Sequence, residues 1–384
     1  MTDAPPAPRP APVAAFAAAT LAPAGLIALA ALAGGGWVWA ALGYMTALTY
    51  ALDRLIAAFG EGGGADGEAE FPAADALSVA LAVVHPAVLA LAIAGTCGAT
   101  GLPGPARAGL FVAAGLWFGQ VSNSNAHELI HRTRRGLYRL GVAVYVTLLH
   151  GQHASGHRLV HHRFVATPED PATARAGEGF WAFLPRAWWG EFRGGWRAET
   201  ALRARAAGRG RGLHPYAVYL AGGAACLGLG LAAFGWGGVA AHLGFAAYAQ
   251  AQLMLSDYVQ HYGLQRARDD RGRWEPVGPA HSWDAPQAFS GLVMLHAPRH
   301  ADHHLHPGRP YPALRITRGA TPMLPRSLPL MATLALVPPA WRRVMDPRLA
   351  RWQARQGDHG VVTPGAGREG CEGRPGSGRL SRDG

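Results

Sequence analysis

The sequence predicts an all-α, polytopic membrane protein with six transmembrane helices and a cytoplasmic helical cap that is rich in histidine. Hydrophobic residues make up 49% of the 384 residues and charged residues only 15%, below the roughly 25% usual in soluble domains. Several runs stay apolar for about 20 residues, the length that a helix needs to cross a bilayer. Many of the 18 histidines gather in short clusters directly beside these runs. These observations together favour a membrane bundle that carries a polar site at one end.

Six segments are apolar enough to be the predicted spans: residues 12–33, 37–56, 76–98, 108–125, 215–234 and 239–259. Glycine-rich turns at 34–36 and 235–238 separate the first and last pairs, since glycine adopts the backbone conformations that tight turns need. Residues 137–149 are apolar but too short to cross, so we expect a buried or re-entrant helix. Residues 180–196 mix tryptophan with arginine, which is typical of an amphipathic helix in the interface plane, and 327–339 predict a short surface helix.

The net charge of +11 comes entirely from arginine, because the sequence contains no lysine. A basic chain raises the question of nucleic-acid binding, but the arginines lie mostly in loops beside the spans. The positive-inside rule explains them and excludes nucleic acid as the expected partner. The rule places segments 126–213 and 260–326, and both termini, in the cytoplasm. We expect residues 1–11 and 353–384 to be disordered on either side of one integral-membrane domain, residues 12–352.

The histidine clusters have the spacing of metal ligands. Residues three and four apart share one face of a helix, so His127 and His131 are expected to point together, as are His157 and His161. The same holds for His300, His303 and His304. Imidazole is a common ligand of iron, copper and zinc, and the clusters offer more rings than one ion takes. We therefore predict two metal ions, and the residues alone leave the choice among the three metals open.

These motifs resemble those of the membrane-bound alkane 1-monooxygenases, whose wider relatives are the membrane fatty-acid desaturases and hydroxylases. The resemblance spans roughly residues 35–350. The motifs that carry it are His-Glu-Leu-Ile-His-Arg at 127–132, Gly-His-Arg-Leu-Val-His-His-Arg-Phe-Val-Ala-Thr-Pro-Glu-Asp-Pro at 156–171, Asp-Tyr-Val-Gln-His-Tyr-Gly-Leu-Gln-Arg at 257–266, Arg-His-Ala-Asp-His-His at 299–304, Arg-Pro-Tyr-Pro-Ala-Leu-Arg at 309–315 and the tail at 338–348.

The resemblance implies a non-haem centre of two iron ions in a hydroxylase domain of a bacterial-type inner (plasma) membrane. Carried over motif by motif, the nine iron ligands are His127, His131, His157, His161, His162, His261, His300, His303 and His304. The implied reaction is O2-dependent hydroxylation of the terminal methyl group of a medium-chain alkane, or a similar hydrophobic substrate, to a primary alcohol. The chain has no cysteine knuckle and no G-x-G-x-x-G motif, so electrons must come from elsewhere, and the resemblance implies rubredoxin and an NADH-dependent rubredoxin reductase.

The sequence departs from the family pattern in the residues around the predicted ligands. The family usually has Glu before the first histidine of the second motif, where this chain has Gly156. The usual Asn and Glu around His261 are Asp257 and Gln260, and the usual Leu-Gln before Arg299 is Ala-Pro at 297–298. Residues at such positions orient metal ligands, so the departures leave substrate and rate open while the ligands themselves remain.

Four acids stand beside the predicted ligands and are candidates to accept the free imidazole N–H groups: Glu128, Asp170, Asp257 and Asp302. Pairing with a nearby arginine is the alternative for each of them. His150 and His153 are extra to the family pattern, and we expect them to support the centre or handle protons and not to bind the metal. His85, inside the third span, is expected to be a buried, hydrogen-bonded histidine.

Two other functions remain open at this point. A desaturase or hydroxylase acting on a lipid tail would use the same centre and would differ only in its product. A metal transporter is a different class, and it should carry polar ligands in the middle of its spans, where this chain has almost none apart from His85 and His242. Chain-length preference and oligomeric state are not determined by the sequence.

Overall fold

The computed structural model describes residues 13–59, 71–205 and 212–359, and within these ranges the chain is helical, with isolated bridges in place of strands. The predicted disordered N-terminus, residues 60–70 and 206–211, and the end of the chain after residue 359 lie outside the described residues. The last helix continues beyond the boundary expected at 352 and ends at His359. The all-helical prediction is confirmed for the described part of the chain.

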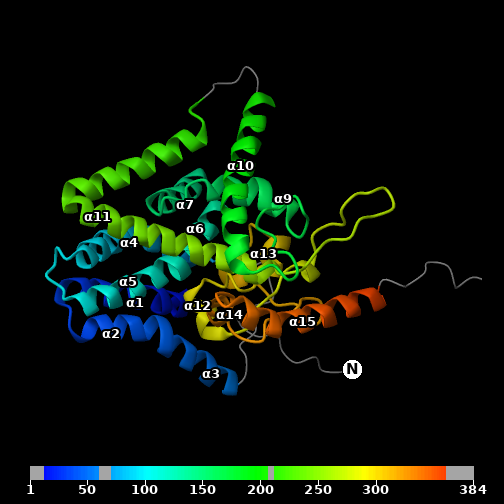
Figure 1. Ribbon diagram of the computed structural model, residues 1–384, viewed down its shortest axis with the longest axis horizontal. Helices are drawn as coiled ribbons and strands as arrows, with labels where there is room; N and C mark the ends of the chain where they lie inside the picture. The colour runs from blue at the N-terminus through cyan, green and yellow to red at the C-terminus, as the bar shows by residue number, and fades with distance from the viewer. Residues whose placement is uncertain (1–12, 60–70, 206–211, 360–384) are drawn as a thin grey trace, which may run out of the picture.

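In chain order the elements of the first half of the chain are α1 (Val13–Ala33), α2 (Gly36–Gly43), the π-helical turn η1 (Tyr44–Leu48), α3 (Thr49–Phe59), α4 (Pro72–Cys97), α5 (Gly104–Trp117), the π-helical turn η2 (Phe118–Ser122), α6 (Asn123–Ile130) and α7 (Arg135–Thr147). Of these, α1, α2 and α3 lie at the lower left of Figure 1, and α6 and α7 lie higher, near the middle. The predicted second and fourth spans are each interrupted by one of the π-helical turns. The short helix predicted at 137–149 is α7, and it packs against α6.

The second half packs against the first through α11 (Pro215–His261), which contacts α4 and α5, and it carries the remaining histidine motifs. Its elements are α8 (His153–Gly156), the π-helical turn η3 (His157–His161), α9 (His162–Phe164), α10 (Phe180–Arg205), α11 (Pro215–His261), η4 (Pro279–His281), α12 (Ala288–Val293), α13 (His300–Leu305), η5 (Tyr311–Ala313), α14 (Leu328–Ala335) and α15 (Pro338–His359). The helices predicted at 180–196 and 327–339 correspond to α10 and α14.

Three described helices are long and apolar enough to cross a membrane, judged by length and composition: Val13–Ala33, Ala73–Cys97 and Pro215–His261. The third of these, α11, contains both the fifth and the sixth predicted spans. Its backbone leaves the helical region at Gly235, where φ is 63°, and Figure 1 shows the resulting sharp bend. A positive φ is readily adopted by glycine and strained for other residues, so the predicted turn is present as a kink between two arms.

The turns of the bundle meet at one end of the molecule, on the left of Figure 1. Ideal Cβ atoms on two of their glycines would touch other turns: one on Gly34 would lie 2.7 Å from Leu102, and one on Gly237 3.5 Å from Cys97. The chain segments that carry the histidine motifs lie away from these turns, around α13 and α9 (Figure 1). The fold therefore separates the turns from the histidines.

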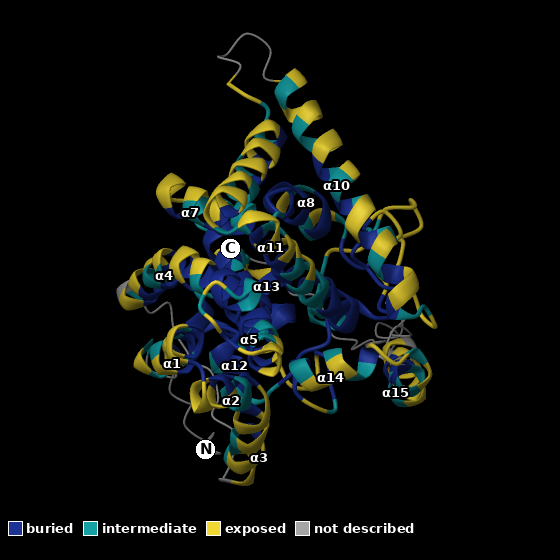
Figure 2. Cartoon of the chain, turned by 60° about the vertical axis from the view of Figure 1, so that its left-hand side comes forward, coloured by how far each residue is buried: buried dark blue, intermediate teal, exposed yellow. Residues whose placement is uncertain are grey.

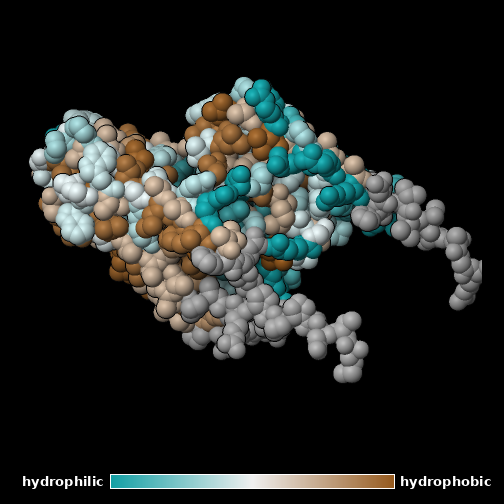
Figure 3. All heavy atoms as spheres, turned by 90° about the horizontal axis from the view of Figure 1, so that it is seen from below, coloured by the Kyte–Doolittle hydropathy of each residue, from teal (hydrophilic) through white to brown (hydrophobic). Residues whose placement is uncertain are grey.

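Burial follows this division. Figure 2 shows the buried residues gathered around α5, α12, α13 and the lower arm of α11, whereas α10 exposes one face along its length. On α10 the buried positions include Phe180, Phe183 and Ala187, and the exposed ones include all four tryptophans and several arginines. Seen from below, the most hydrophilic side chains lie mainly on the right-hand half of the surface (Figure 3). A bundle with one polar end is the arrangement that places a cap beside an apolar interior.

Candidate metal centre

All nine histidines predicted as ligands converge at one place between α6, η3, α9, α13 and the last turn of α11. They sort into two groups in which the candidate ligand nitrogens lie within 4.8 Å of one another. The first group is His127, His131, His157, His162 and His303; the second is His161, His261, His300 and His304. Segments almost 180 residues apart in the chain thus meet at adjoining sites, and each group has enough imidazoles to hold one metal ion.

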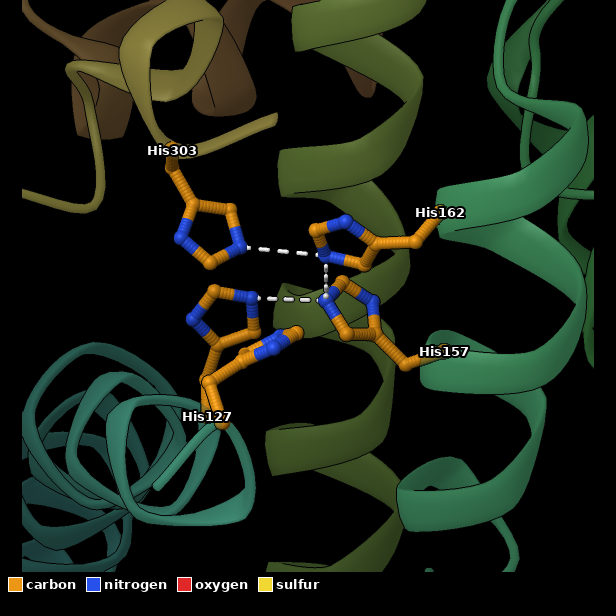
Figure 4. A group of neighbouring side chains, drawn as sticks. His127, His157, His162 and His303 are labelled. Atoms are coloured by element: carbon orange, nitrogen blue, oxygen red, sulfur yellow. Dashed lines mark hydrogen bonds between the residues drawn. The ribbon is translucent and has the colours of Figure 1, made fainter. Parts of the chain in front are cut away.

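Figure 4 shows how the rings of the first group lie. His127 from α6, His157 and His162 from the segment η3–α9, and His303 from α13 point toward one another. The Nε2 atoms are 2.8 Å apart between His127 and His157, 2.9 Å between His162 and His157, and 3.1 Å between His303 and His162. In the second group the Nε2 atom of His300 is 3.1 Å from that of His261 and 3.0 Å from that of His304.

The π-helical turn η3 decides which ring joins which group. The sequence predicts that His157 and His161, four residues apart, point together, as they would on an α-helix. In the π-helix the repeat is longer, with hydrogen bonds between residues five apart. His157 therefore shares its group with His162, and His161 turns into the second group with its ring stacked 5.1 Å from that of His157. His303 likewise separates from His300 and His304.

Desolvation keeps most of these imidazoles neutral. It lowers the pKa of His127 to about 3, and the pKa values of His157, His300, His303 and His304 lie well below the ordinary value for the same reason. Burial removes water from both forms of the ring, but the charged imidazolium loses far more hydration free energy than the neutral imidazole. A neutral ring keeps a free lone pair, which is the form that binds a metal.

The donor set fits a pair of transition-metal ions. Imidazole nitrogens facing one another can share hydrogen bonds only in donor–acceptor pairs, and the Nε2 atoms of His131 and His161 have no hydrogen-bond partner among the described residues. A cation at the middle of each group would bind these lone pairs directly. Imidazole donors suit zinc, copper, iron or nickel better than magnesium or calcium. The geometry is therefore that of two adjoining metal sites.

Asp170 orients one predicted ligand. Its Oδ2 atom accepts a hydrogen bond of 2.9 Å from Nδ1 of His161 and one of 2.7 Å from the hydroxyl of Thr173. Burial disfavours the charged imidazole, but the Asp170 carboxylate outweighs it and raises the pKa of His161 to about 9. Carboxylate contacts of this kind fix the tautomer so that Nε2 faces the metal. The backbone carbonyl of His281 takes a similar position at Nδ1 of His261, 3.3 Å away.

Among the described residues, the other three candidate acids form no hydrogen bond to the predicted ligands. Glu128 pairs with Arg132 and accepts from the backbone N–H of Tyr311 at 3.1 Å. Asp302 pairs with Arg309 and with His306. Both acids therefore link the motif helices to neighbouring segments through arginine side chains and backbone N–H groups. This is the alternative that the sequence left open for them, in place of accepting a hydrogen bond from a ligand imidazole. Asp257 lines two small cavities beside the centre.

The histidines outside the two groups fall into distinct roles. His85 bonds to the hydroxyls of Ser122 and Thr147 at 2.9 and 2.7 Å, the buried, hydrogen-bonded role expected for it. His150 and His153 lie together with Glu191 in a third group of possible metal ligands. Glu191 was missed by sequence reasoning, because it belongs to no motif and stands in a helix recognised only by its tryptophans.

An apolar cavity of about 400 Å³ lies next to the centre, a volume within the range of ligand pockets. Its walls come from α3, α5, α11 and α14 and from both π-helical turns of the bundle. A smaller cavity of about 50 Å³ touches His127, His157 and His300. The two cavities share four wall residues: Gly119, Ser256, Met294 and Leu328. An apolar molecule that extends from the larger cavity into the smaller one would therefore have one end beside the histidines.

Helices able to cross a membrane, together with histidine clusters able to hold metal ions, define the class of histidine-rich membrane metalloproteins. The family model described as "Fatty acid desaturase" matches residues 103–335, more than half of the chain, and the chain belongs to that family.

The chain is similar to several curated alkane 1-monooxygenases, a narrower group than the family model describes. The chain is 37% identical over 255 residues to alkane 1-monooxygenase 1 of Pseudomonas aeruginosa, which covers 65% of each protein. It is 34% identical over 252 residues to the alkane 1-monooxygenase of Pseudomonas putida, covering 63% of this chain and 61% of that protein. It is 32% identical over 233 residues to the alkane 1-monooxygenase of Acinetobacter baylyi, covering 60% of this chain and 56% of that protein. The resemblance seen in the motifs is confirmed, and the chain spans between 56% and 65% of the length of these relatives.

Proposed function

We propose that this protein is an alkane 1-monooxygenase: it hydroxylates the terminal methyl group of a medium-chain alkane, or of a similar hydrophobic substrate, to a primary alcohol. In the balanced reaction the substrate, O2, two electrons and two protons give the alcohol and one water. The observation that carries the proposal is the convergence of nine histidines beside a small cavity that shares four wall residues with the larger apolar one. The names of the relatives agree with this reaction.

The nine histidines are proposed to hold two iron ions, one in each group. When bound there, iron supplies the redox chemistry that the reduction of O2 requires. The protein's own part is to keep most of the imidazoles neutral through burial and to aim them, with Asp170 fixing the ring of His161. Burial of the second group, whose four histidines are all buried, keeps bulk water away from the site, where it would divert a reactive centre to side reactions.

The cavity is proposed to bind and orient the substrate. An alkane offers no polar group to grip, so only the shape of an apolar cavity can aim its terminal methyl group. The side chains of Leu116, Leu255 and Met294 line the wall, and Met294 lies where the larger cavity meets the smaller one. An alkane would enter this cavity between the helices, from the hydrocarbon of the membrane. This route fits the topology predicted from the sequence, six spans with a cytoplasmic cap, which is part of the proposal.

The electrons are proposed to come from rubredoxin and an NADH-dependent reductase on the cytoplasmic side. His131 and His162 of the first group are partly exposed, and the exposed arginines Arg134, Arg158 and Arg163 stand beside them in the chain. A positive surface near the centre would steer an acidic electron donor into place. The arginine-rich segments of the sequence support a cytoplasmic position for this surface, in a protein of the inner membrane.

The family model favours one further candidate, a desaturase or hydroxylase of lipid acyl chains. Product analysis separates the two. The purified protein, loaded with iron and supplied with rubredoxin, its reductase and NADH, should convert a medium-chain alkane to the primary alcohol with one atom of ¹⁸O from ¹⁸O2. A protein that binds two irons, forms no alcohol, and instead desaturates or hydroxylates an acyl lipid would contradict the proposed substrate and support the alternative.

A further inference from the structure

A third cluster of metal-binding side chains lies outside the nine histidines. His150 and His153 stand just before and at the start of α8, and Glu191 projects from the middle of α10. The three are 1%, 2% and 4% exposed, and their candidate ligand atoms lie within 4.8 Å of one another. Two imidazoles and a carboxylate are the protein ligands of many zinc and non-haem iron sites.

The hydrogen bonds of the cluster leave several ring nitrogens without partners. Nδ1 of His153 is 2.6 Å from one oxygen of Glu191, and Nε2 of His150 is 3.7 Å from the other. Both ring nitrogens of His150, and Nε2 of His153, are buried without a hydrogen-bond partner among the described residues. Buried polar atoms are normally paired, because leaving them unpaired is costly. A cation bound to the two rings and the carboxylate would remove this cost for one nitrogen of His150.

The local sequence makes room for the cluster. An ideal Cβ at Gly156 would lie 2.4 Å from Cγ of Glu191, and one at Gly195 would lie 3.1 Å from Cα of Gly156. These glycines let α10 approach α8 closely enough to insert the Glu191 side chain. The related enzymes usually carry Glu where this chain has Gly156, so here a carboxylate from another helix occupies the space beside that position.

There is also room for one small additional ligand. A cavity of about 10 Å³ is lined by His153, Gly156 and Glu191, together with Asp170, which is close to the space that one water molecule needs. Three protein ligands and one water complete the tetrahedral coordination that zinc prefers. The cluster therefore has the ligand number, the burial and the space of a mononuclear site.

We propose that His150, His153 and Glu191 bind a third divalent transition-metal ion, zinc or ferrous iron, in addition to the two ions assigned to the nine histidines. This ion joins α10 to the segment that carries the second histidine motif, since the ring of His153 lies 4.9 Å from that of His157. It positions that motif and takes no part in O2 chemistry. The assignment stands on the three side chains alone and does not depend on the hydroxylation reaction.

The competing explanation is a buried, hydrogen-bonded cluster of the two histidines and the carboxylate with no metal, and metal analysis separates the two. Zinc and iron per chain are measured by mass spectrometry on the purified full-length protein after dialysis against metal-free buffer. Wild type should retain one more ion per chain than either Glu191→Gln or His150→Gln. Glu199→Gln is the matched control, because Glu199 lies two turns further along α10 and accepts only from Ser155 among the described side chains, at 2.7 Å.

Equal metal content in wild type, both variants and the control would overturn the proposal. The identity of the lost element distinguishes zinc from iron. If both variants fail to fold, anomalous diffraction from wild-type crystals at the zinc and iron edges decides: a peak between His150, His153 and Glu191 supports the site, and its absence refutes it. The alcohol assay described above reports on the proposed reaction separately, so failure of one proposal leaves the other testable.

Discussion

Replacing Asp170 by Asn tests how the metal centre is held. The carboxylate accepts from Nδ1 of His161 at 2.9 Å, from Thr173 at 2.7 Å and from the backbone N–H of Ala172 at 3.0 Å. Asn has the same shape, but it loses the charge and one acceptor oxygen, so it cannot satisfy all three donors. Its NH2 group would then face a donor, and the ring of His161 would lose the contact that fixes its tautomer.

The size of the effect follows from the kind of contact. Removing a carboxylate that orients a metal-bound histidine typically lowers metal affinity by about 10- to 100-fold, which corresponds to about 1.4–2.8 kcal/mol. Iron affinity should therefore fall by that factor in Asp170→Asn, and only at the group that contains His161. Competition with a coloured chelator, titrated against folded protein, measures it.

Glu169→Gln provides the control for this variant. Glu169 is the neighbouring residue, but its side chain is 45% exposed and it pairs with Arg268 at 3.6 Å on the surface. Exposed pairs of this kind contribute little, so iron affinity should stay at the wild-type value. Unchanged affinity in Asp170→Asn, or an equal loss in both variants, would refute the role given to Asp170.

Three further predictions test the ligands, the cavity and the electron-transfer surface. His303→Ala should lose the iron of the first group and all turnover, as measured by metal content and alcohol formation; full activity would refute the assignment of this ligand. Ser256→Phe places a ring where the two cavities meet, so hydroxylation of long alkanes should fall about tenfold or more with iron content unchanged; equal rates with short and long alkanes would count against the cavity. Arg163→Glu should raise the KM for rubredoxin about tenfold at low salt without changing single-turnover chemistry; a KM insensitive to this change and to salt would place the docking surface elsewhere.

The sequence predicted the parts of the centre that local geometry controls. His127 and His131 lie one helical turn apart and share a group, as do His300 and His304. The division of His161 from His157 was not predictable, because it depends on a π-helical turn that has no clear sequence signal. The meeting of α13 with α6 was expected from the family resemblance and not from local geometry, because it results from packing between segments far apart in the chain.

The fold was predictable where composition acts alone. Apolar length predicted α1 and α4, and a run of glycines predicted the bend at Gly235. The π-helical turn inside the second predicted span was missed, since residues 37–56 read as one apolar run. Glu191 was missed for a different reason: its role comes from the close approach of α10 to Gly156, a tertiary contact that no local pattern encodes.

Locating the bound metals tests the central claim most directly. Anomalous diffraction at the iron edge, collected from crystals of the iron-loaded protein, should give one peak among His127, His131, His157, His162 and His303 and a second among His161, His261, His300 and His304. A single peak, or zinc alone in either group, would contradict a pair of irons held by these nine side chains.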